Sequence, residues 1–130
     1  MGAKYLIDTN TIIELLTQLL PPAGGAWVDG LMLRDEHAIS VINWIELLVN
    51  PQSAQEKAVL ELFIASSPVL PLDADVVRQT ILLRQQYRTK LPDAIVAATA
   101  LVHGLVLVSR NTGDFQKMTG LVVINPHDII

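Results

Sequence analysis

The sequence predicts an α/β domain in which helices flank a mostly parallel sheet of four or five strands, and three observations support this. Short apolar runs alternate with helix-like patterns along the chain, as expected of parallel strands joined by helical crossovers. The run LVLV at 105–108 is apolar without interruption, which is typical of a central strand covered on both faces. The 130 residues contain no repeat, low-complexity tract or break in composition, so we expect a single domain over residues 1–130.

The first half of the chain is expected to form two strands and four helices. The strands are 4–7 (KYLI) and 37–40 (HAIS), and the helices are 9–20, 26–33, 42–49 and 54–65. Pro21 and Pro22 end the first helix, because a proline ring clashes with the preceding helical turn and carries no N–H. Pro51 follows the third helix in the same way.

The second half is expected to add two helices and the strands 68–70, 105–108 and 121–124. One helix is capped by Asp73 and runs to about Tyr87. The other starts at Pro92, since proline favours the first helical turn, and stops at Gly104. Residues 94–102 are apolar on every side, so we expect this helix to be largely buried.

Composition narrows the class of protein. Hydrophobic residues make up 51% of the chain and aromatic residues only 5%, so the core must be aliphatic. The absence of cysteine excludes disulfides, thiolate chemistry and cysteine-based zinc sites. The longest apolar stretch, 94–108, is interrupted by His103 and Gly104 and is too short to span a bilayer, and no signal peptide is recognisable. We therefore expect a cytoplasmic protein without a membrane partner.

The charges are unevenly distributed along the chain. A net charge of −4 argues against a protein that holds nucleic acid by a bulk positive field. Between residues 76 and 127, however, the only acids are Asp93 and Asp114, among six lysines and arginines. This pattern is expected of an acidic, phosphate-handling site in a basic half of the chain, although a solvated basic helix face over 78–88 would also produce it.

Two of the acids are predicted to lie at the same edge of the sheet. Asp8 follows the first strand directly, and Asp114 comes six residues after LVLV. Ligands of open α/β sheets bind beyond the carboxyl ends of the strands. Asp93 falls in the first turn of the buried helix, where the helix dipole favours an anion. Glu46 has apolar neighbours in the sequence, and a carboxylate buried among them would need a partner.

Each of these acids taken alone could be a helix cap or a first-turn residue, but their joint placement favours a metal site. Carboxylates at close range repel one another and raise each other's pKa values, and a divalent cation reverses that cost. Magnesium and manganese prefer hard oxygen ligands and retain several waters. Such an ion lowers the pKa of a bound water and stabilises the leaving oxygen when a phosphodiester is hydrolysed.

The chain contains three ordered segments, YLIDTN, ISVINWIELL and LPDAIVAATALVHGLVLVSRNTGDF, followed by the ending LVVINPHDI. Together they resemble the signature blocks of PIN domains, specifically those of VapC-like toxins of bacterial and archaeal toxin–antitoxin pairs. The resemblance covers nearly the whole chain at the expected spacing. It implies a three-layer α/β/α PIN-like fold, dependence on Mg²⁺ or Mn²⁺, and endonucleolytic cleavage of RNA. It also implies a homodimer and a cognate antitoxin, for which residues 21–33 are a candidate contact.

The same resemblance implies which acids are catalytic and bind the metal. Matched by motif, Asp8, Glu46 and Asp93 correspond to the first three acids of the family. The fourth can fall at either of two positions in the block written here as SRNTGDF, those of Asn111 and Asp114. Because this chain carries its acid at the second position, we expect Asp114 to complete the set, while Asn111 could still ligate through water.

Further residues are expected around these acids. Candidate hydrogen-bond partners of the ligands are Thr9, Asn10, Ser109 and Asn111, although roles in turns and helix caps would also explain them. Candidate RNA contacts are Arg84, Arg88, Lys90, Arg110 and Lys117.

Two other classes of protein remain open. The first is a PIN-like protein without activity that only binds a partner or RNA. The second is an aspartate-nucleophile phosphatase, since DTNT at 8–11 resembles its start, but Asn10 stands where that class has a second aspartate. A phosphorelay receiver domain is disfavoured, because Asp8 stands alone after the first strand and no lysine follows LVLV until Lys117.

Overall fold

The computed structural model describes residues 2–130 and contains a five-stranded sheet in the order β3-β2-β1-β4-β5. The strands are β1 (Tyr5–Ile7), β2 (His37–Ser40), β3 (Val69–Leu70), β4 (Val106–Val108) and β5 (Val123–Ile124). Every neighbouring pair is parallel. The predicted parallel sheet is therefore confirmed, with the uninterrupted apolar strand β4 in an interior position.

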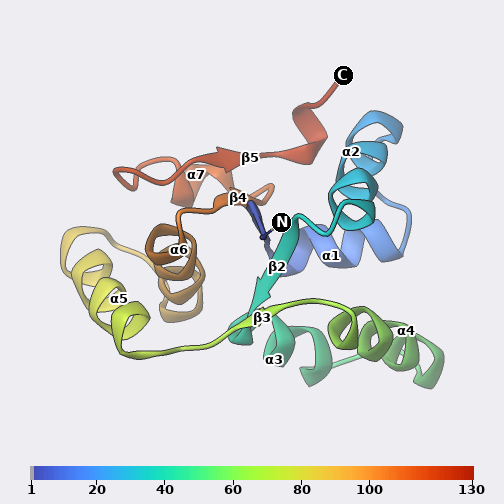
Figure 1. Ribbon diagram of the computed structural model, residues 1–130, viewed down its shortest axis with the longest axis horizontal. Coiled ribbons are helices and arrows are strands. Elements are labelled where there is room, and N and C mark those ends of the chain that lie inside the picture. Colours follow the sequence, from blue (N-terminus) through green and yellow to red (C-terminus); the bar gives the residue numbers. More distant parts are fainter. Residues whose placement is uncertain (1) are drawn as a thin grey trace.

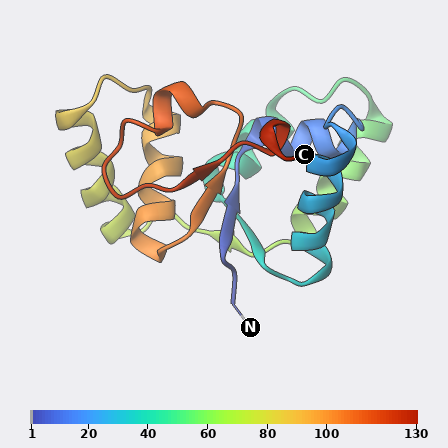
Figure 2. The same cartoon turned by 90° about the horizontal axis from the view of Figure 1, so that it is seen from above.

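Helices cover both faces of the sheet, which gives the three-layer α/β/α arrangement. On one side lie α5 (Ala74–Gln86) and α6 (Leu91–His103). On the other side lie α1 (Thr9–Leu16), α2 (Pro22–Leu33) and α4 (Ala54–Ala65) (Figures 1 and 2). The remaining helices are α3 (Val41–Val49) after β2, the short α7 (Thr112–Phe115) after β4, and the 3₁₀ turn η1 (Pro126–Asp128), which packs against α2.

Successive residues of the strands point into two separate cores, because side chains alternate across a strand. Leu6 and Leu107 join the core beneath α5 and α6. Their neighbours Ile7 and Val108 join the core beneath α1, α2 and α4. All four of these side chains are fully buried. Both faces of the central strands are therefore apolar, which explains why LVLV shows no alternation in the sequence.

The boundary between the first two helices differs from the predicted one. α1 ends at Leu16 rather than at residue 20, and Gln18 has a positive φ of 59°, which is incompatible with a continuing helix. α2 begins at Pro22 rather than at residue 26. Pro22 occupies the first turn of α2. Backbone N–H groups there have no acceptor within the helix, so the lack of an N–H in proline costs no hydrogen bond. The expectation that the prolines end the first helix was therefore wrong, because α1 ends before them and Pro22 instead starts the second helix.

The predicted bounds of α5 and α6 agree closely with the structure. Asp73 caps α5 by accepting a hydrogen bond from Val76 N at 3.0 Å. Gly104 ends α6 in the left-handed conformation, with φ 66°. Residues 94–100 of α6 are all buried. None of the helices in residues 2–130 is long and apolar enough to cross a membrane.

Candidate acidic site at the carboxyl edge of the sheet

Asp8 lies where β1 ends, beside the end of β4. Ile7 pairs with Val108 in the sheet register, and Asp8 N donates to Val108 O at 2.9 Å. The Asp8 side chain is 7% exposed and caps α1, with Oδ1 accepting from Thr9 N at 2.9 Å. Its other oxygen, Oδ2, accepts from the hydroxyl of Ser109 at 2.8 Å. Both carboxylate oxygens are thus held in fixed directions.

Ser109 is oriented by its own neighbour. It is fully buried, and its hydroxyl oxygen accepts a hydrogen bond from Asn111 N at 3.0 Å, which leaves the hydroxyl proton for Asp8. Asn111 contributes this backbone N–H, while its side chain does not cap α7. Asn10, in contrast, accepts a hydrogen bond from Thr11 Oγ1 at 3.2 Å, and none of its side-chain hydrogen bonds within residues 2–130 reaches an acid of the site.

Glu46 is tied to the same corner through Thr9. The hydroxyl of Thr9 donates to Glu46 Oε1 at 2.8 Å and accepts from Asn43 Nδ2 at 3.0 Å. Glu46 itself is exposed, as is its neighbour Ile45 at 54%. The expectation that Glu46 is buried among apolar side chains was therefore wrong, because α3 presents much of its apolar face to solvent.

Asn43 was not anticipated as a site residue from the sequence. It is fully buried, and its Oδ1 accepts from Ser40 N at 2.8 Å in the capping box that starts α3. One side chain therefore caps the helix and positions Thr9. The sequence did offer one indication of its role. Asn43 is the only amide side chain within the apolar run ISVINWIELL, and a buried amide needs hydrogen-bond partners.

The four predicted acids influence one another electrostatically. Burial raises the pKa of Asp8 to about 6, the hydrogen bonds from Ser109 and Thr9 oppose this, and the charges of Asp93 and Glu46 add to it. Burial also raises the pKa of Asp93, assisted by the charges of Asp114 and Glu46. Asp8, Glu46, Asp93 and Asp114 therefore form one negatively charged group, which we call the acidic cluster.

The donor chemistry of the acidic cluster fits a hydrated divalent cation. All its ligand atoms are hard carboxylate oxygens, and no Lys or Arg within residues 2–130 forms an ion pair with any of the four. In the same part of the chain, no three acidic or histidine side chains converge closely enough to hold one ion directly. Magnesium usually keeps several waters and binds through one or two carboxylates, so the arrangement suits an ion held partly through water.

A basic hollow adjoins this cluster. It is lined by Arg84, Arg88, Thr89, Lys90 and Asp114 and has a volume of about 370 Å³. Lys90 is close enough to Asp93 to counteract the rise in the pKa of that carboxyl. The hollow thus joins three of the predicted RNA contacts to one acid of the cluster.

The other two predicted RNA contacts are engaged with protein groups. Arg110 Nη1 donates to Glu14 Oε2 at 3.2 Å, and His127 Nε2 lies 2.9 Å from the same oxygen. Lys117 Nζ donates to the backbone oxygen of Arg88 at 3.0 Å. Glu14 is 7% exposed, and this buried carboxylate was not singled out in the sequence.

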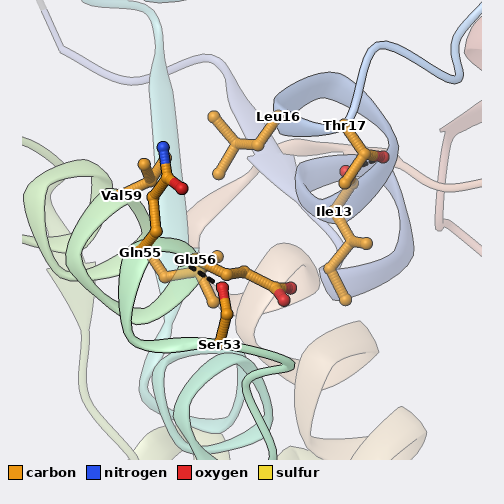
Figure 3. Close-up of a pocket in the computed structure, with 8 residues that line it drawn as sticks. Ile13, Leu16, Thr17, Ser53, Gln55, Glu56 and Val59 are labelled. Carbon is orange, nitrogen blue, oxygen red and sulfur yellow. Dashed lines mark hydrogen bonds between the residues drawn. The ribbon is translucent and has the colours of Figure 1, made fainter.

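A second, more apolar hollow of about 300 Å³ lies between α1 and α4. Figure 3 shows Ile13 and Leu16 of α1 facing Val59 of α4 across it, with the N-cap of α4 at Ser53 beside them. None of the four acids lines this hollow. It is therefore separate from the acidic site.

Comparison with known proteins agrees with this architecture. The family model described as PIN domain matches residues 5–121. The chain is 32% identical to Toxin FitB of Neisseria gonorrhoeae, over 95% of this chain and 99% of that protein. It is 30% identical to VapC ribonuclease Y4jK of Sinorhizobium fredii, over 93% of this chain and 96% of that protein. A toxin–antitoxin complex from Klebsiella pneumoniae contains a chain of the same fold, with a TM-score of 0.72, 30% identity, and coverage of 97% and 100%.

The three-layer α/β/α fold and the match of the family model over residues 5–121 define the class of protein, a PIN domain. The chain belongs to the PIN-domain family, and its relatives include a FitB toxin and a VapC ribonuclease.

Proposed function

We propose that this protein is a metal-dependent endoribonuclease that hydrolyses RNA phosphodiester bonds, and that it is the toxin of a toxin–antitoxin pair. The observation that carries the proposal is the acidic cluster at the carboxyl edge of a PIN domain, where burial and the charges of neighbouring acids together raise the pKa values of Asp8 and Asp93. The similarity to a VapC ribonuclease supports RNA as the substrate class.

Asp8, Glu46, Asp93 and Asp114 would hold Mg²⁺ or Mn²⁺, with Asp114 rather than Asn111 as the fourth acid. When bound, the ion would supply an activated water and stabilise the leaving oxygen. The protein's own task is to fix the ligands before the ion arrives. Ser109 and Thr9 N hold the two oxygens of Asp8, and the Thr9 hydroxyl holds Glu46.

The aspartate-phosphatase alternative is disfavoured by Asn10, which stands where that class has a second aspartate. The Asn10 side chain accepts a hydrogen bond from Thr11 Oγ1 at 3.2 Å, and within residues 2–130 it makes no hydrogen bond to an acid of the cluster.

We further propose a cytoplasmic protein that forms a homodimer and is blocked by a cognate antitoxin. The antitoxin partner is supported by the structural relative that comes from a toxin–antitoxin complex. The exposed apolar side chains of α3, among them Trp44 at 46% and Val49 at 72%, offer a surface for protein contact. Light scattering after gel filtration would test the dimer, and co-purification with the product of an adjacent small gene would test the antitoxin.

The central test is RNA cleavage by the purified protein, with mapping of the 5′ ends of the products. Wild type should cleave in millimolar Mg²⁺ or Mn²⁺ and stop when the ion is chelated. Asp8→Asn should abolish cleavage, whereas Asp128→Asn, which changes an exposed acid in η1, should not. Equal cleavage by wild type and Asp8→Asn would overturn the proposed site. RNA binding without cleavage by the wild type would favour the alternative of an inactive binding module.

A further inference from the structure

Three cations and one carboxylate, that of Asp114, line the basic hollow. The side chains of Arg84, Arg88 and Lys90 line the hollow and are exposed. Within residues 2–130, none of the three forms an ion pair with a carboxylate. By contrast Arg78, on the same helix as Arg84, is paired with Asp75 at 2.7 Å. Unpaired cations that surround one hollow are suited to bind an anionic ligand.

The segment that carries these cations is fastened to the segment that follows α7. The hydroxyl of Tyr87 lies 3.2 Å from Thr119 Oγ1 and accepts from Thr119 N at 3.1 Å. Lys117 Nζ donates to the backbone oxygen of Arg88 at 3.0 Å. We call these hydrogen bonds the loop clamp. They join the loop between α5 and α6 to the segment that follows Asp114 in the chain. The clamp therefore fixes the cations relative to an acid of the cluster.

We propose that the basic hollow binds backbone phosphates of single-stranded RNA next to the phosphate that is cleaved at the acidic cluster, and that the loop clamp positions this hollow. The proposal rests on the proposed function. It says where the RNA nucleotides next to the cleaved bond bind. It also narrows the predicted RNA contacts to Arg84, Arg88 and Lys90, because Arg110 and Lys117 bind protein groups. Because phosphate contacts carry no base information, binding at the hollow is independent of RNA sequence.

Binding can be measured separately from cleavage. We would measure the anisotropy of a labelled single-stranded RNA, in chelator so that no strand is cut, over a range of salt concentrations. For single strands, the slope of log K against log salt changes by about 0.7 for each phosphate contact, which corresponds to roughly fivefold in affinity at 0.1 M salt. Arg88→Ala with Lys90→Ala should therefore weaken binding by about 25-fold and flatten the slope by about 1.4.

Arg78→Ala is the matched control, since it removes one exposed arginine charge from α5 outside the hollow. It should leave both the affinity and the slope close to the wild-type values. An unchanged slope in the Arg88→Ala, Lys90→Ala variant, or an equal loss in Arg78→Ala, would overturn the proposed hollow. If wild type binds as expected but does not cleave in Mg²⁺, the proposed function fails while the hollow stands.

The loop clamp is tested by Tyr87→Phe, which keeps the ring and removes the hydroxyl. If Tyr87 positions the hollow, KM for RNA should rise several-fold with kcat nearly unchanged, because the acidic cluster is intact. Tyr5→Phe is the control, since the Tyr5 ring packs edge-on against Trp27 and its hydroxyl makes no hydrogen bond within residues 2–130. Unchanged KM in Tyr87→Phe, or a fall in kcat alone, would contradict the positioning role.

Discussion

Ser109 donates a hydrogen bond of 2.8 Å to Asp8 Oδ2, although the two residues are 101 positions apart in the chain. The contact follows from the pairing of Ile7 with Val108, which brings the next residue of each strand to the same edge. It stabilises the charged form of Asp8, since the hydrogen bond opposes the rise in pKa caused by burial. The bond thus helps to keep a buried carboxylate ionised near neutral pH.

Replacing Ser109 by alanine should shift the pH dependence of cleavage. Without the hydroxyl, the pKa of Asp8 rises further above about 6, so more of the protein carries a neutral Asp8 at mildly acidic pH. We expect Ser109→Ala to lose more activity at pH 6.5 than at pH 8, in a profile of kcat/KM against pH. Ser66→Ala removes a hydroxyl bonded to a backbone oxygen at the end of α4 and should leave the profile unchanged. A uniform loss at every pH would contradict the role assigned to Ser109.

Asp8 is expected to destabilise the metal-free protein. Its pKa is about 6 in the folded state against 3.8 ordinarily, so the unfolded chain loses this proton first as the pH rises. The free energy of unfolding therefore falls between pH 3.8 and about 6, and the whole loss is present at pH 7. A difference of roughly two pH units corresponds to about 3 kcal/mol.

Asp8→Asn should accordingly be more stable than wild type at pH 7 in chelator, by up to about 3 kcal/mol. The measurement is urea unfolding, repeated at pH 5, where the advantage of the variant should shrink. The amide can still accept from Thr9 N, so the cap of α1 is retained. A variant less stable than wild type at pH 7 would show that the surroundings favour the charged carboxylate.

The Thr9 hydroxyl is expected to position Glu46 for activity. It donates to Glu46 while accepting from Asn43, so its removal frees the carboxylate and leaves the buried amide without one partner. We expect Thr9→Val to lower kcat at least tenfold and to cost roughly 1–2 kcal/mol of stability. Thr9→Ser keeps the hydroxyl and should restore both quantities. Equal kcat in the two variants would show that the Thr9 hydroxyl does not position Glu46 for activity.

His37 should make the protein sensitive to acid, with the opposite sign to Asp8. Burial lowers its pKa below 6.5, with Nε2 3.0 Å from Ser67 Oγ and Nδ1 buried without a partner. The unfolded chain therefore binds this proton at higher pH than the folded protein, and stability falls as the pH drops below about 6.5. His37→Gln should show a smaller loss of Tm between pH 7 and 5.5 than wild type. His103→Gln changes an exposed histidine and should behave as wild type.

The sequence was sufficient to predict those parts of the site that depend on local pattern. Apolar runs located the strands, and the order of strand and acid put Asp8 at the sheet edge. Caps such as Asp73 and Gly104 gave the helix bounds. The short helix α7 was not predicted, because its four residues are held by burial of Phe115 rather than by helical periodicity.

Contacts between distant segments could not be read from the chain in the same way. The bonds of Asn43 to Thr9 and of Tyr87 to Thr119 join residues more than 30 positions apart, and no local pattern encodes them. The exposure of Glu46 was misjudged for a related reason. Apolar neighbours in the sequence indicate burial only if the helix packs on all sides, and α3 does not.

The identity of the fourth acid gives the last prediction. If Asp114 completes the metal site, Mg²⁺ should raise the Tm of wild type, because the ion binds the folded cluster and not the unfolded chain; at 100 times the Kd this is worth about 2.7 kcal/mol. Asp114→Asn should lose much of that rise. In chelator it should be slightly more stable than wild type, since removal of its charge lowers the pKa of Asp93. Asn111→Ala should keep the rise, as should Asp29→Asn on the surface of α2. The reverse result, with the rise lost in Asn111→Ala and kept in Asp114→Asn, would move the fourth ligand to position 111.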